Sequence, residues 1–141
     1  MRTVAEIQAR LEPLVKKYGL TLLVLFGSQA TGTTHAHSDV DIAYSAQPQL
    51  SLTNECGLIV DLMPVCGAEH IDLSSLARAP ALLMKEIALT GIPLHESLDT
   101  PFSDFIVRAI HEYEETKPLF LARSQYVAYR AEIYRRELAH V

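Results

Sequence analysis

The sequence lacks the features that mark membrane and secreted proteins. Among its 141 residues no run approaches the roughly 18 apolar residues of a membrane span, and Arg2 is followed by a charged amphipathic pattern rather than by the apolar stretch of a signal peptide. Cys56 and Cys66 are the only cysteines, too few for a disulfide framework and without the further ligands of a zinc site. We therefore expect a cytoplasmic protein whose cysteines are reduced core thiols.

The sequence also has no excess of basic residues. Its 12 Lys and Arg are outnumbered by 17 Asp and Glu, and the formal net charge is -5 at pH 7. Because binding along DNA or RNA needs clustered Lys and Arg to neutralise the phosphates, we expect no direct nucleic acid binding. The 49% hydrophobic content is typical of a compact globular domain.

A short apolar run over residues 21–26 ends at the pair Gly27-Ser28. The run is rich in branched and aromatic residues, which predicts a strand buried on both faces. A glycine where that strand ends lets the backbone approach an anion closely, and the N–H groups that open a following helix favour negative charge. The sequence therefore predicts a phosphate-binding turn at Gly27 and Ser28.

Ten residues separate Ser28 from Asp39-Val40-Asp41, which lies in a second predicted strand. Strand alternation places the side chains of Asp39 and Asp41 on one face and Val40 on the other, toward the core. Two carboxylates held so close favour a cation, and Mg²⁺ prefers oxygen ligands. An Asp-x-Asp pair alone is more often a solvated strand edge, but the order of strand, glycine turn, loop and strand favours a metal site.

The pattern Gly27-Ser28-x10-Asp39-x-Asp41 resembles the signature of the minimal nucleotidyltransferases of the DNA polymerase β superfamily. Members of that family carry a third acid on a later strand, followed by a helix and a short closing strand. Here Asp72 lies in a predicted strand at residues 70–73, a predicted helix covers about 74–90, and residues 91–96 close the unit. The resemblance spans roughly residues 1–96. It implies that Asp39, Asp41 and Asp72 are the catalytic, metal-binding acids.

The same resemblance implies the chemistry. Two Mg²⁺ ions would be held by the three acids, ATP would be the substrate, and Gly27 and Ser28 would bind its phosphates, with Asp72 accepting the proton of the attacking hydroxyl. The family often carries arginines in the turn, whereas this sequence has Gln29 to Gly32 there and supplies no cation. We interpret the loop residues His35 and His37 as surface residues, because neutral imidazole is a poor Mg²⁺ ligand.

The remaining pattern indicates an α+β fold, with a mixed sheet and helices packed on one side. Thr3 and Glu6 form a potential capping box for a helix over residues 4–18, and a second helix is expected over 52–65. Asp61 lies in that second helix and is an alternative third acid, although its place outside the strand register favours a surface or capped carboxylate.

Residues 97–141 differ from the rest and predict a helical extension. Apolar residues recur there at helical spacing, which indicates two helices joined near Lys117-Pro118. Four of the six tyrosines lie in this tail among arginines, a composition typical of protein interfaces. Packing of the tail on its own domain explains the pattern equally well.

Short family members with such tails resemble the antitoxins of HEPN/MNT toxin–antitoxin modules. The resemblance implies transfer of AMP from ATP to a tyrosine of a cognate HEPN ribonuclease toxin, within a stable hetero-oligomer. Two alternatives remain open: a non-catalytic antitoxin that acts by binding, and a nucleotidyltransferase that modifies a small molecule such as an aminoglycoside.

Overall fold

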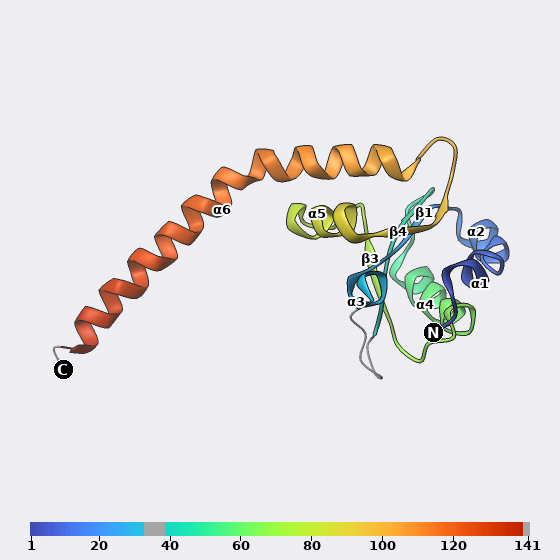
Figure 1. The fold of residues 1–141 in the computed structure, drawn as a ribbon, viewed down its shortest axis with the longest axis horizontal. Helices are drawn as coiled ribbons and strands as arrows, with labels where there is room; N and C mark the ends of the chain where they lie inside the picture. Colours follow the sequence, from blue (N-terminus) through green and yellow to red (C-terminus); the bar gives the residue numbers. More distant parts are fainter. Residues whose placement is uncertain (33–38, 140–141) are drawn as a thin grey trace.

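The computed structural model describes residues 1–32 and 39–139, so His35 and His37 lie outside the described residues (Figure 1). The elements in chain order are α1 (Val4–Gln8), α2 (Glu12–Tyr18), β1 (Leu20–Phe26), α3 (Gly27–Thr31), β2 (Val40–Ala46), α4 (Leu52–Cys66), β3 (Ile71–Ser75), α5 (Ala81–Thr90), β4 (Ile92–Glu96) and α6 (Phe102–Ala139). Within the described residues, no helix is both long and apolar enough to cross a membrane.

The four strands form one mixed sheet in the order β3-β2-β1-β4. β1 pairs antiparallel with both β2 and β4, whereas β2 and β3 are parallel. Parallel neighbours need a long crossover connection, and α4 provides it between β2 and β3. The predicted α+β fold with a mixed sheet is confirmed.

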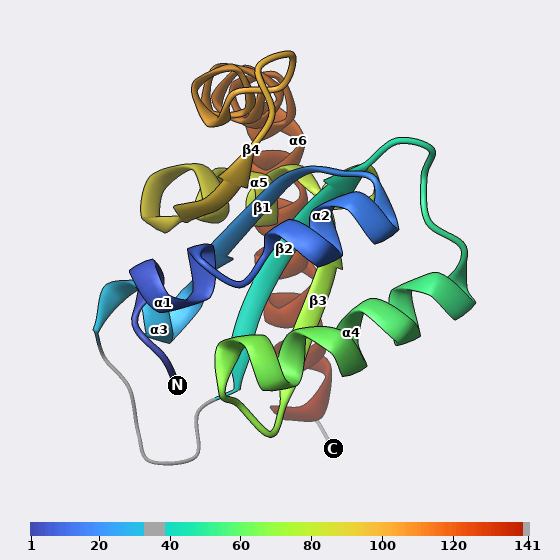
Figure 2. The same cartoon turned by 90° about the vertical axis from the view of Figure 1, so that its right-hand side faces the viewer.

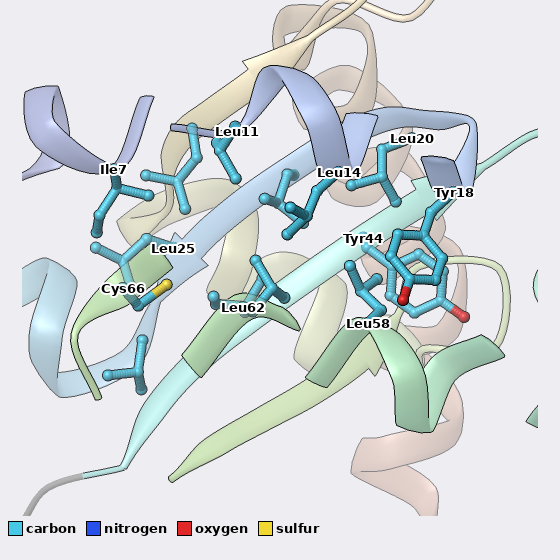
Figure 3. Packing of buried hydrophobic residues seen from close by; sticks show 14 of the residues in the cluster. Ile7, Leu11, Leu14, Tyr18, Leu20, Leu25, Tyr44, Leu58, Leu62 and Cys66 are labelled. Carbon is cyan, nitrogen blue, oxygen red and sulfur yellow. The ribbon is translucent and has the colours of Figure 1, made fainter. Parts of the chain in front are cut away.

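Helices cover both faces of the sheet, so the prediction of helices on one side only is wrong (Figure 2). One hydrophobic cluster joins α1, α2 and α4 to residues such as Leu23, Leu25 and Ile42 (Figure 3). The second cluster joins α5 and α6 to Leu22 and Val24 on the opposite face. Alternate residues of β1 thus enter different clusters, which confirms that this strand is buried on both faces.

Two predicted helices begin or end elsewhere because of proline. Residues 4–18 form two helices, since Pro13 lacks an N–H and its ring would clash with the carbonyl of Ala9 in a continuous helix. The capping box of Thr3 and Glu6 is confirmed. The helix expected from residue 74 begins only after Pro80, because β3 continues to Ser75 and the residue before a proline disfavours helical backbone.

The helix predicted over residues 52–65 is confirmed as α4, and it anchors β2 from one side. The hydroxyl of the buried Tyr44 donates a hydrogen bond to the Glu55 carboxylate, which also pairs with Arg78. Cys66 is buried in the first cluster, and burial raises the pKa of its thiol to about 11. Cys56 is exposed, so the expectation of a core thiol is wrong for this residue.

The tail forms one long helix, α6, rather than two helices joined near Pro118. Pro118 lies inside α6, and the helix bends midway along its length, as expected where a proline removes a backbone hydrogen bond (Figure 1). Before the bend, Phe102, Phe105 and Ala109 are buried in the second cluster. After the bend, residues 119–131 are all exposed and the helix extends away from the sheet.

Candidate active site

Gly27 makes the transition from β1 to α3 without an intervening loop. Its φ of +70° lies in the left-handed region, which residues other than glycine rarely adopt. A Cβ built on Gly27 would lie 2.2 Å from Asp41 Oδ2, far inside van der Waals contact. The turn and the acid are therefore in direct contact, and no larger residue fits at this position without displacing the carboxylate.

The sheet brings the three predicted acids to one end of β2. Asp41 lies opposite Phe26 of β1 in the antiparallel register and opposite Asp72 of β3 in the parallel register. Asp39 comes just before β2 begins, two residues from Asp41 and therefore on the same side of the extended chain. Asp41 is half-buried, whereas Asp39 and Asp72 are exposed.

The electrostatic surroundings of Asp41 oppose its ionisation. Burial raises the pKa of the Asp41 carboxyl, and the negative charges of Asp72, Asp39 and Glu86 raise that pKa further. Among the described residues, none of the ion pairs brings a Lys or Arg to these four carboxylates. The site therefore concentrates negative charge that the described part of the chain does not neutralise.

Glu86 is the member of this group that the sequence did not reveal. It lies on α5, which packs over the sheet on the face that also carries Ala43 and Phe26. Its neighbours along the chain show only the pattern of an apolar helix, and no spacing links it to the acids on the strands. Only the packing of α5 against the second cluster brings Glu86 close enough for its charge to raise the pKa of Asp41.

The acids fit a hard divalent cation by their chemistry. Carboxylate oxygens are the ligands that Mg²⁺ prefers, and a cation would relieve the repulsion that the other three charges exert on Asp41. The side chains as they stand do not complete such a site, because no group of three or more His, Cys, Asp or Glu within residues 1–32 and 39–139 is arranged to hold a metal ion. Side-chain rotation of exposed Asp39 and Asp72 would be needed to bring three ligands together.

An open cavity of about 610 Å³ adjoins the acids on the side of α4. Asp39, Asp72 and Glu69 contribute carboxylates to its lining, and Met63 and Ile59 of α4 contribute an apolar wall. The cavity can therefore admit a polar or cationic group next to the acids.

Asp61 lies away from these acids and is not their third member. Its carboxylate accepts hydrogen bonds from Lys17 Nζ and from the Tyr18 hydroxyl, each at 2.7 Å, and so joins α4 to α2. The hydrogen bond from Lys17 is the largest cause that lowers the pKa of Asp61. The interpretation of Asp61 as a capped carboxylate is confirmed.

We predict that Asp61→Asn lowers stability and leaves nucleotide chemistry unchanged. Because the pKa of Asp61 is lowered in the folded protein, its stabilising contribution is present at neutral pH and disappears as the pH falls through the folded pKa. Thermal unfolding at neutral pH should therefore give a lower Tm for the variant, with the difference shrinking in acid. Loss of nucleotide transfer at full stability would instead place Asp61 in the chemistry.

Comparisons with known proteins agree with this geometry. The family described as Polymerase beta, Nucleotidyltransferase matches residues 10–99. The protein adenylyltransferase MntA of Aphanizomenon flos-aquae (strain 2012/KM1/D3) is 29% identical over 128 residues, which cover 83% of this chain and 85% of the relative.

Solved structures give the same fold. A crystal structure of a toxin-antitoxin with AMP-PNP contains a chain that is 26% identical, with a TM-score of 0.72 over 86% of this chain and 98% of the other. A complex of tri-AMPylated Shewanella oneidensis HEPN toxin with MNT antitoxin matches at 22% identity and a TM-score of 0.69, over 89% and 99% of the two chains, and shows the fold alone. Since the family match includes the glycine turn and both acid-bearing strands, the chain belongs to the Polymerase beta, Nucleotidyltransferase family.

Proposed function

We propose that this chain is an antitoxin that transfers AMP from ATP to a tyrosine of a cognate HEPN ribonuclease toxin and so neutralises it. The observation that carries the proposal is the contact of the Gly27 turn with Asp41, which in turn lies in register with Asp72. Support for the acceptor comes from the MntA relative, named a protein adenylyltransferase, and from the toxin-antitoxin structure that holds AMP-PNP, an ATP analogue.

The residues of the site have distinct roles in this proposal. Backbone N–H groups at Gly27 and Ser28 bind the phosphates of ATP, since the turn itself offers no cationic side chain. Asp39, Asp41 and Asp72 would hold two Mg²⁺ ions, which would supply charge stabilisation to the attacking and leaving oxygens. The tyrosine oxygen attacks the α-phosphorus, its proton passes to Asp72, and pyrophosphate leaves.

The two parts of the chain have different roles in this proposal. Residues 1–96 carry every strand that the structure describes and every proposed catalytic residue, and they form the nucleotidyltransferase unit. Residues 97–141 form the partner-binding tail, which the buried Phe102 and Phe105 anchor to the second cluster. With most of its exposed aromatic side chains beyond Pro118, the tail offers protein surface rather than a second substrate domain.

One observation favours a second candidate, transfer of the nucleotide to a small molecule. The cavity beside the acids carries Asp39, Asp72 and Glu69, and such an acidic pocket suits a polycationic acceptor such as an aminoglycoside. This candidate requires no protein partner, which separates it from the first.

Transfer of label from ATP tests the proposal. The purified chain is incubated with its co-purified partner, Mg²⁺ and ATP labelled at either the α- or the γ-phosphate, and the proteins are analysed by mass spectrometry. We expect α-label but no γ-label on a partner tyrosine, and no label when EDTA removes the metal. Label on an aminoglycoside without any partner would support the second candidate, whereas a tight complex that never acquires label would indicate an antitoxin that acts by binding alone.

A further inference from the structure

The half of α6 beyond Pro118 exposes a regular stripe of residues. Its members recur at alternating intervals of four and three, the spacing of a coiled-coil seam. We call this stripe the seam, and it consists of Phe120, Ser124, Val127, Ala131, Tyr134 and Leu138. The four large members are between 38% and 75% exposed, although each would be buried at the centre of a helix pair.

A groove accompanies the seam on the same side of the helix. It has a volume of about 660 Å³, and Phe120, Ser124, Val127 and Ala131 line it together with Leu82 of α5. The small side chains of Ser124 and Ala131 leave room there for a second backbone to approach. Most of the stability of helices in proteins comes from packing of an apolar face against another element, so we expect another helix to occupy the groove.

We propose that the occupant is the α6 helix of a second copy of this chain, lying antiparallel to the first. In an antiparallel pair, Phe120 of one copy meets Ala131 of the other, and Val127 meets Ser124, so these two large side chains each lie opposite a small one. A parallel pair would instead set Phe120 against Phe120 and Ala131 against Ala131, which leaves alternating bulges and voids. The antiparallel pairing is self-complementary and closes with two-fold symmetry.

The charge distribution along α6 favours the same arrangement. Residues 102–116 carry four acidic residues and one basic residue, whereas residues 117–139 carry five basic and two acidic residues. In the register that matches the large and small residues, the basic end of one copy at residues 135–139 lies along the acidic residues 112–116 of the other. In the same register, Glu114 of one copy flanks Arg135 of the other, and these side chains are 59% and 78% exposed in the single chain.

One contact in this register is unfavourable. Arg123 of one copy lies near Arg130 of the other on the flank of the seam. Arg130 is already engaged, because its guanidinium lies over the ring of Tyr134 and donates a hydrogen bond to that hydroxyl. In a parallel pair Arg130 of one copy would lie beside Arg135 of the other. The parallel arrangement therefore also places two arginines next to each other, and it forms no pair of opposite charges.

The first test measures the mass of the full-length chain alone, by sedimentation equilibrium across a wide range of concentration. We expect a dimer, and we expect Ala131→Glu to raise its dissociation constant by about 100-fold or more, since two charges would be buried in the seam. Ala122→Glu, an equally exposed change on the opposite side of the helix, is the matched control and should remain dimeric. Circular dichroism and the Tm of each variant verify that the body is folded.

The second test reverses the flanking charges. Arg135→Glu should weaken the dimer about tenfold. Adding Glu114→Arg to this variant should restore the affinity, because residues 114 and 135 of the two copies then again carry opposite charges at both symmetry-related contacts. Arg136→Glu is the control, since Arg136 also pairs with Glu132 within its own helix but lies away from the seam. Equal weakening by Arg135→Glu and Arg136→Glu would contradict the register.

Disulfide trapping determines the direction of the helices. In a background with Cys56→Ser, a mixture of Phe120→Cys and Ala131→Cys chains should form the mixed disulfide, whereas Phe120→Cys alone should not cross-link. Cross-linking of Phe120→Cys with itself would establish a parallel pair and overturn the proposal. A chain that stays monomeric at every concentration, with a seam needed only for a partner protein, would also overturn it and would leave the proposed enzymatic function unaffected.

Discussion

Asp41→Asn should abolish nucleotide transfer and at the same time make the metal-free protein more stable at neutral pH. The substitution removes a carboxylate that the proposed mechanism needs for its metal ions, and we expect transfer to fall by about 10³-fold or more. It also removes a negative charge that the charges of Asp72, Asp39 and Glu86 repel. Loss of function and gain of stability should therefore come from the same change.

The sign of the stability effect follows from the direction of the pKa shift. Because burial and neighbouring charges raise the pKa of Asp41 in the folded protein, the ionised carboxyl opposes folding once the pH exceeds the folded pKa. The Tm values of wild type and variant should converge in acid and separate toward neutral pH, with the variant higher. These measurements are made in EDTA, so that metal binding does not contribute.

Asp61→Asn is the matched control for this experiment. It is the same chemical change, but the pKa of Asp61 is lowered rather than raised, so the Tm at neutral pH should move in the opposite direction. Added Mg²⁺ should then raise the Tm of wild type and of Asp61→Asn, and have much less effect on Asp41→Asn. A fall in Tm for Asp41→Asn in EDTA would show that its carboxylate stabilises the fold and that the repulsion described above is not dominant.

Gly27→Ala adds a single methyl group, and we expect it to destabilise the fold more than a methyl group added elsewhere in the site. The left-handed backbone at Gly27 disfavours alanine, and the added Cβ would fall 2.2 Å from Asp41 Oδ2. Backbone strain and overlap together should lower the free energy of unfolding by about 3 kcal/mol or more. Displacement of Asp41 should also reduce nucleotide transfer in whatever fraction of the protein remains folded.

Gly32→Ala separates the two causes. Gly32 has a φ of +74°, close to that of Gly27, but a Cβ there meets no atom of the described residues within 4 Å. We expect it to cost only the backbone strain, about 1–2 kcal/mol, and to leave transfer intact. Chemical denaturation of the three proteins measures both differences. Equal losses for the two variants would mean that Asp41 moves aside freely, and that the turn and the acid are not mechanically coupled.

The parts of the site that lie close together along the chain could be predicted from the sequence. Strand alternation and the glycine at the end of β1 are local properties, so the residue pattern alone relates Gly27, Asp39 and Asp41 to one another. Asp72 required the resemblance to a family, because the parallel register of β3 with β2 leaves no local signal. Glu86 could not be predicted, since only the packing of α5 over the sheet brings it to Asp41.

Two errors in the predicted fold have physical causes that the sequence contains. Pro13 forbids a continuous helix over residues 4–18, and a helical pattern of apolar residues on both sides concealed this. The run over residues 21–26 has no polar face, so a strand there needs cover on both sides, which excludes helices on one side only. Pro118 is the opposite case, because α6 bends at that point but does not end.

The second hydrophobic cluster also determines when in its synthesis the protein can complete its fold. Among the described residues, the last strand ends at residue 96, and every member of the first cluster lies at or before Leu94. The second cluster stays open until Phe102, Phe105 and Ala109 emerge, and the half-buried Asp41 lies on that later face. A nascent chain that stops short of α6 would therefore expose apolar side chains of β1 and α5, and this exposed surface would favour aggregation until residues 102–109 are synthesised and packed.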